Sequence, residues 1–179
     1  EKYNELNEPD SALYWLEFSE EKIPFRTDEE SYNIQSLFAI NYLKLNALDQ
    51  ASIIAHRIKP IIRREFINDF EKFQRYQQEF DELNNKFETS RRSGDVKKQR
   101  ELRASVQALY DETQRLGEQI IQVRQYLIIT QYLLYESGNE SEAAELSQEL
   151  NTLMLGTQIP SLPLSKEESD QEVRRYGIL

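Results

Sequence analysis

Six basic side chains that lie close together in the sequence are the strongest candidate for a chemical contact. They are Arg91, Arg92, Lys97, Lys98, Arg100 and Arg103. Asp95 and Glu101 are the acidic residues among them. Guanidinium and ammonium groups at this density can contact phosphates, an anionic membrane surface or an acidic protein. The alternative is that Lys and Arg keep an exposed helix end in solution. No aromatic residue lies between the charges, so stacking on nucleic acid bases is not indicated.

The single histidine, His56, is a candidate for acid–base or anion chemistry because it lies beside Arg57 and Lys59. A functional interpretation makes its imidazole a base or an anion contact. No Ser, Cys or acidic partner is placed beside it by the sequence, so we expect it to pack or cap at the end of a strand. Adjacent carboxylates such as Asp28 and Glu29 point in different directions on a helix, and no catalytic role is assigned to them.

Several classes of site are excluded by residue type. The chain has no Cys, which excludes a disulfide framework, a Cys-ligated metal centre and a thiol nucleophile. One His excludes a multi-His metal site within this chain. Neither GxxxxGK[ST] nor GxGxxG occurs among the five glycines, so nucleotide hydrolysis is not indicated. The sequence therefore predicts a chain that has no cofactor and is not an enzyme.

The overall composition is that of a folded, acidic chain. Its 179 residues include 22 Lys+Arg and 32 Asp+Glu, for a net charge of −10. Gly and Pro number five each, against ten Tyr and eight Phe, which favours a globular protein over a disordered one. The length suits one domain, or one domain with an insertion. The acidic total argues against nucleic acid as a partner, although basic residues outnumber acidic ones between 56 and 103.

A seven-residue pattern predicts two long helices. Phenylalanine recurs at this spacing at Phe66, Phe73, Phe80 and Phe87. A second apolar series from Leu102 to Val123 alternates steps of four and three, and a polar turn with Gly94 lies between the two. Two such helices form an antiparallel hairpin, predicted over 63–123. We expect the aromatic edge to pack between the two arms. The alternative is that part of it docks a second copy and makes a homo-oligomer.

Four segments rich in aromatic and β-branched residues predict strands. They are Leu13–Phe18, Ala51–Ile58, Tyr126–Tyr135 and Thr157–Leu164. Pro60 marks the end of the second, because proline lacks the N–H that a ladder needs. One helix is predicted from a cap at Thr27 to about Asn46, and another from about Glu140 to Leu155, followed by Gly156.

This order of elements predicts an α+β fold, a ferredoxin-like split β-α-β core with an inserted antiparallel helical hairpin. The core would comprise residues 1–62 and 124–164, the hairpin residues 63–123, and a loose polar tail residues 165–179. The competing interpretation is an all-helical bundle in which the strand segments are helical. The run from Ile120 to Leu134 fits both.

Four pieces of sequence, taken in order, match a known arrangement. They are Leu16–Phe25 with Thr27 after it, Leu45–Arg57, Arg124–Ile129 after a long charged insert, and Glu142–Leu146. Together, Leu13 to Ile159 resembles the N-terminal domain of the VirB-type conjugation ATPases of type IV secretion systems. In that family the ATP-binding motifs belong to the following domain, and no catalytic residue carries over to this chain.

The resemblance implies a non-catalytic assembly domain of a conjugative transfer machine, either as part of an ATPase or as a stand-alone subunit. Its partners would be other secretion components. It would be cytoplasmic, at the inner face of the membrane, with a peripheral membrane contact. Two other hypotheses follow from the residues alone. One is a free-standing coiled-coil adaptor without a sheet, and the other is a nucleic-acid-binding module that uses the basic cluster at the tip of the hairpin.

Overall fold

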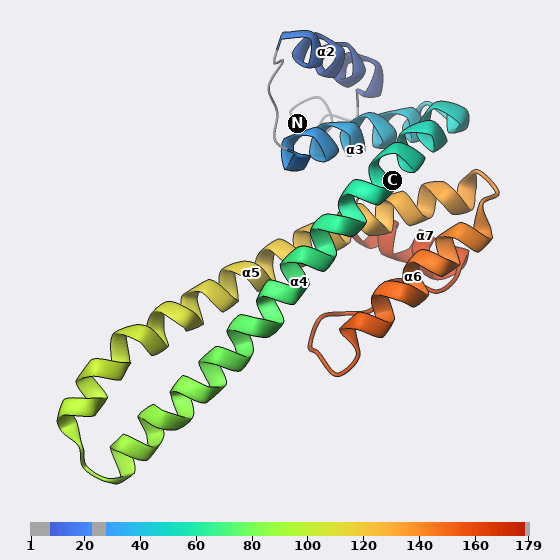
Figure 1. Cartoon of the computed structure of the whole chain (residues 1–179). Coiled ribbons are helices and arrows are strands. Elements are labelled where there is room, and N and C mark those ends of the chain that lie inside the picture. The colour runs from blue at the N-terminus through green and yellow to red at the C-terminus, as the bar shows by residue number, and fades with distance from the viewer. Residues whose placement is uncertain (1–7, 23–27, 178–179) are drawn as a thin grey trace. The chain divides into compact units, whose positions relative to one another are not determined.

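The computed structural model describes residues 8–22 and 28–177, which form α-helices joined by short loops (Figure 1). The helices are α2 (Pro9–Lys22), α3 (Asp28–Lys44), α4 (Leu48–Arg92), α5 (Val96–Glu136), α6 (Glu140–Met154) and α7 (Lys166–Arg175). Contacts divide the chain into two compact units. The first unit is Glu1–Arg64 with Arg124–Leu179, and the second unit is Glu65–Val123. Both α4 and α5 contribute to each unit.

The predicted α+β, ferredoxin-like core is wrong, because no strand occurs in the ranges that the structure describes. Three of the four predicted strands are helical: Leu13–Phe18 lies in α2, Ala51–Ile58 in α4 and Tyr126–Tyr135 in α5. The fourth, Thr157–Leu164, is a loop. The competing all-helical interpretation is the correct one.

Burial on every side explains why the α5 segment resembled a strand. Each residue from Leu127 to Tyr135 is buried. A helix enclosed by neighbours all round is apolar all round, and its sequence loses the helical period that an exposed face would impose. Pro60, taken as the end of a strand, lies inside α4. The apolar run Leu127–Tyr135 therefore indicates that the segment is buried, and does not indicate whether it is a helix or a strand.

Two helix pairs in the first unit are joined by the same turn. α3 leads into α4 through Asn46, at φ 58°, and α5 leads into α6 through Gly138, at φ 79°. This is the left-handed conformation of a Schellman helix end. Ala47 N donates to Tyr42 O and Asn139 N to Leu134 O, both at 2.8 Å. The second bond of each turn is 2.9 Å from Asn46 N to Leu43 O and 3.2 Å from Gly138 N to Tyr135 O. A turn of the same kind, with Gly94 at φ 74°, also joins α4 to α5, so it is a local helix-end feature of this chain.

The second unit is an antiparallel pair of helices (Figure 1). The turn between them contains Gly94 at φ 74°, so the prediction of two long helices joined by a glycine turn is confirmed. The rings of Phe66 and Phe70 are fully buried and stack at 6.0 Å between centroids. Phe80 is half-buried and lies 5.9 Å from the ring of Tyr110. The aromatic side chains between the two helices are therefore fully buried near Phe66 and become more exposed toward Gly94.

The C-terminal segment is ordered as a helix, so the expectation of a loose tail from Ser165 is wrong. The Ser165 hydroxyl caps α7 by accepting a bond from Glu168 N at 3.2 Å. Val173 is completely buried and anchors the helix. The predicted helix from about Glu140 is confirmed as α6, and Gly156 follows its end at φ 80°. The predicted helix that ends near Asn46 is α3, while its predicted cap, Thr27, lies outside the described residues.

Candidate interaction surfaces

The structure brings the predicted cations together at the turn of the helical hairpin. Arg91 and Arg92 end α4, and the others lie in the first turns of α5. All six side chains are exposed. We call this group the basic tip: Arg91, Arg92, Lys97, Lys98, Arg100 and Arg103.

Few charges of the basic tip are neutralised locally. Arg91 pairs with Glu88 at 3.2 Å, and Lys97 lies 4.0 Å from Glu101. Within the part of the chain that is described, the other four cations form no ion pair. The Asp95 carboxylate caps α5 by accepting a bond from Lys98 N at 3.0 Å. Since a carboxylate already holds the helix end, an anion at the tip would be bound by side chains, in a salt-sensitive contact.

His56 takes part in an ion-pair cluster between α4 and α6, so its expected place at a strand end is wrong. Its Nε2 lies 3.2 Å from Glu142 Oε2, and its Nδ1 lies 2.9 Å from the carbonyl oxygen of Ser52. Lys59 Nζ donates to the other oxygen of Glu142. That hydrogen bond, and then the charges of Lys59 and His56, hold the pKa of Glu142 below its ordinary value. The acidic partner that sequence spacing could not place comes from another helix.

A second ion pair joins the same two helices. Arg63 Nε donates to Glu149 Oε2 at 2.7 Å, and its Nη2 donates to Oε1. The bidentate hydrogen bond lowers the pKa of Glu149 and raises that of Arg63. Both pairs are half-exposed and hold α4 against α6, so we assign them a structural role.

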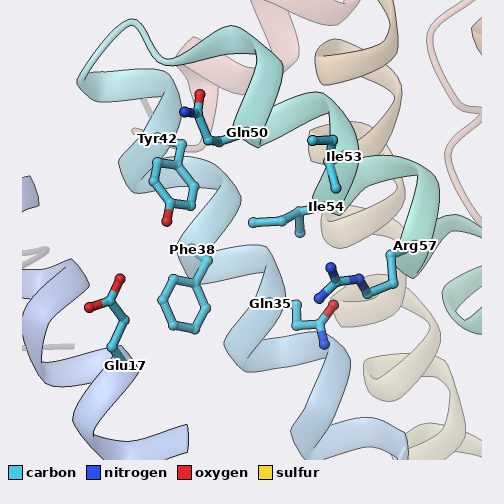
Figure 2. Close-up of a pocket in the computed structure, with 8 residues that line it drawn as sticks. All are labelled: Glu17, Gln35, Phe38, Tyr42, Gln50, Ile53, Ile54 and Arg57. Carbon is cyan, nitrogen blue, oxygen red and sulfur yellow. The ribbon is translucent and has the colours of Figure 1, made fainter.

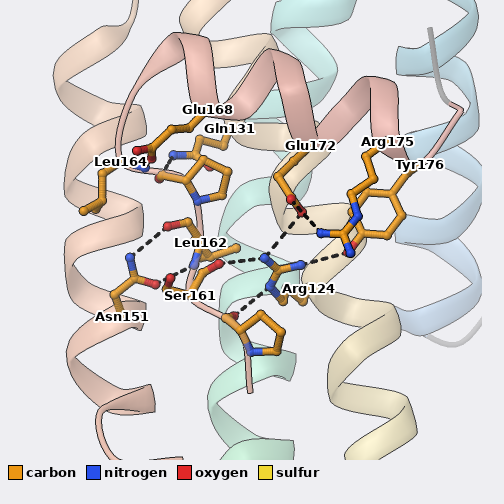
Figure 3. Close-up of polar contacts among 12 residues, drawn as sticks. Arg124, Gln131, Asn151, Ser161, Leu162, Leu164, Glu168, Glu172, Arg175 and Tyr176 are labelled. Carbon is orange, nitrogen blue, oxygen red and sulfur yellow. Dashed lines mark hydrogen bonds and ion pairs between the residues drawn. The ribbon is translucent and has the colours of Figure 1, made fainter. Parts of the chain in front are cut away.

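Arg124 is a buried polar centre that the sequence analysis did not single out (Figure 3). Its side chain is 5% exposed. Nε donates to Pro160 O at 2.8 Å, Nη2 to Ser161 O at 2.6 Å, and Nη1 to the Tyr176 hydroxyl at 2.9 Å. The carboxylate of Glu172 lies 3.6 Å from Nη2. One arginine therefore ties α5 to the loop after α6 and to α7.

The loop 157–165, which we call the strap, is held by side chains in place of a β-ladder (Figure 3). Asn151 Nδ2 donates to Leu162 O at 2.9 Å, and Leu162 N donates back to Asn151 Oδ1 at 2.6 Å. Gln131 Nε2 donates to Pro163 O at 2.6 Å. These bonds explain why the predicted fourth strand does not form. The sequence did contain a signal for this arrangement. Arg124 lies next to the apolar run of α5, and the later segment with Pro160 and Pro163 offers carbonyl groups that such an arginine can bind.

A cavity of about 260 Å³ opens between α2, α3 and α4 in the first unit (Figure 2). We call its lining the cavity face: Glu17, Gln35, Phe38, Tyr42, Gln50, Ile53, Ile54 and Arg57. Phe38 and Tyr42 of α3 stack at 6.5 Å between ring centroids. Ile53 is 60% exposed, and Gln35 Oε1 is buried without a hydrogen-bond partner among the described residues. Figure 2 shows Glu17 of α2 and Arg57 of α4 on opposite sides of Phe38.

The cavity face has the composition of a binding surface. In the ranges described by the structure, no group of three or more His, Asp or Glu residues could hold a metal ion. Of the helices in those ranges, none combines the length and the apolarity required to span a bilayer. The cavity face instead offers an apolar floor and two charges of opposite sign, which suits recognition of side chains from another molecule.

Comparison of this chain with known protein families, with curated proteins and with solved structures found no match.

Proposed function

We propose that this chain is a non-catalytic protein-interaction module, a helical scaffold that binds a partner protein at the cavity face. The observation that carries the proposal is the open apolar cavity beside Ile53, an exposed aliphatic side chain. Fully burying an exposed isoleucine contributes about 1.5–3 kcal/mol, and Ile53, at 60% exposed, can contribute only part of that. The charges of Glu17 and Arg57 on either side would orient the partner.

A narrower proposal follows from the sequence resemblance: that the partner is another component of a conjugation or type IV secretion machine. The quoted pieces of sequence support it. The β-α-β order that accompanied them does not, because Ala51–Ile58 and Tyr126–Tyr135 are helical. The general proposal of a helical interaction module does not depend on this setting.

Binding of an anionic polymer at the basic tip is a second candidate function, favoured by six exposed cations at one turn. Replacement of Arg91, Arg92, Lys97 and Lys98 by Glu should abolish salt-sensitive DNA binding. A chain that shows no salt-dependent binding to DNA before substitution would refute this candidate.

Site-specific photo-crosslinking tests the proposed function. A photoreactive phenylalanine analogue at Ile53 in the full chain should crosslink a defined partner in an extract of the source cells, identified by mass spectrometry. The matched control carries the analogue at Leu153 of α6, which is 40% exposed and lies outside the cavity face. Crosslinks that occur equally at both positions, or at neither, would refute the proposal. Excess unmodified chain should compete for the partner.

A further inference from the structure

One cation of α4 at the cavity face lacks the carboxylate that its neighbours on the same helix have. Lys59 and Arg63 pair with Glu142 and Glu149 of α6. Arg57 is exposed and lines the cavity, and across residues 8–22 and 28–177 it has no ion pair. Its guanidinium is therefore available to a carboxylate from another molecule.

The cavity beside Arg57 is the space that stays open with α2 in place. α2 packs on α3 and supplies Glu17 to the lining. The remaining volume is about 260 Å³, below the roughly 300–1,000 Å³ of a pocket for a drug-sized ligand. A cavity of about 150 Å³ is enough for benzene. This one therefore has room for a single aromatic side chain, but not for a further helix.

The lining of the cavity favours an aromatic ring as the group that enters. Phe38 and Tyr42 of α3 stack at 6.5 Å between ring centroids. Ile54 of α4 lines the same cavity (Figure 2). A further ring placed here would bury its apolar area and pack against the two rings already present.

We propose that the cavity face binds a segment of the partner protein that inserts one aromatic side chain and carries a carboxylate beside it. The ring enters the cavity, and the carboxylate pairs with Arg57. Glu17, on the opposite side of Phe38, repels a carboxylate (Figure 2). The acidic end of the segment therefore lies toward α4 and not toward α2. The inference rests on the proposed function and specifies the part of the partner that binds.

Two small probes with the same apolar body and opposite charges, phenylbutyrate and phenylbutylamine, test this chemistry. Each is titrated into the full chain at low salt, with the isoleucine methyl groups observed by NMR. Phenylbutyrate should shift the signals of Ile53 and Ile54 and bind about three- to fivefold more tightly than the amine. Arg57→Glu should reverse this preference. The matched control, Arg75→Glu, changes an exposed cation of α4 outside the cavity face and should leave the preference unchanged.

The same two variants test whether the carboxylate belongs to the partner protein. Arg57→Glu should reduce the yield of crosslinks formed from Ile53 about three- to fivefold, and Arg75→Glu should not. An undiminished yield in Arg57→Glu would overturn the inference, even if phenylbutyrate binds.

Equal binding of the two probes, or a preference that Arg57→Glu leaves unchanged, would also overturn the inference. So would the absence of any shift at Ile53 and Ile54 at millimolar concentrations of phenylbutyrate. Crosslinks that remain specific to Ile53 after any of these results would leave the proposed function intact, whereas their absence would overturn both.

Discussion

Replacement of Arg124 by Met should release the strap and α7 from the rest of the first unit. The guanidinium donates three hydrogen bonds, to Pro160 O, Ser161 O and the Tyr176 hydroxyl. It also lies 3.6 Å from the Glu172 carboxylate. Methionine fills much of the same volume without a donor, so all four groups lose this partner.

The magnitude follows from the number and exposure of these contacts. A hydrogen bond to a charged group contributes about 1.5–3 kcal/mol, and three would exceed 4 kcal/mol if none were replaced. Pro160 and Ser161 are exposed residues, so water can replace part of that loss. The strap can also open while the rest of the first unit stays folded, so the loss of stability is limited to the contacts that the strap itself makes. We therefore expect a loss of about 2–4 kcal/mol, confined to the strap and α7.

Hydrogen exchange followed by mass spectrometry is the appropriate assay, since it separates local opening from global unfolding. Exchange should rise in peptides that cover residues 157–176 and stay unchanged in those that cover residues 34–62. Tyr176→Phe is the matched control and should cost about 1 kcal/mol, because it removes one of the three bonds. Unchanged exchange over 157–176 in Arg124→Met would refute the role assigned to this arginine.

Three further predictions concern stability. Because Lys59 holds the pKa of Glu142 below its ordinary 4.5, the stability from this pair is present above that pH and lost as the pH falls. Between about pH 6 and pH 3, urea titrations should show the unmodified chain losing about 0.5–1 kcal/mol more than Glu142→Gln; equal losses would contradict this. Gly117→Ala should raise the thermal midpoint, gaining about 0.5–1 kcal/mol, because the new Cβ would lie at an ordinary 3.6 Å from Phe73. A lower midpoint would show that the site is overpacked. Asn46→Ala should cost about 1 kcal/mol in urea titration and Asn46→Gly should not, since residue 46 has φ 58°; similar values for both would count against strain there.

Local sequence patterns were enough to predict the helical hairpin and the position of its turn. Phe66 and Phe73 lie seven residues apart, which is the spacing of apolar residues in two helices that pack along their length. Gly94 supplies the left-handed residue that ends α4. The cluster of cations at that turn followed from the same local pattern. These features could be predicted because each depends on residues within a few turns of one another.

The tertiary structure alone decided the fold class and the cavity face. The run Leu127–Tyr135 is buried on all sides, and full enclosure removes the periodicity that distinguishes a helix from a strand. The partners of Arg124 lie in the strap and α7, far along the chain, so their arrangement depends on packing and not on spacing. The cavity face combines side chains from three helices. Local periodicity records which side of an element is buried, whereas the neighbours that bury it are chosen only when the chain folds.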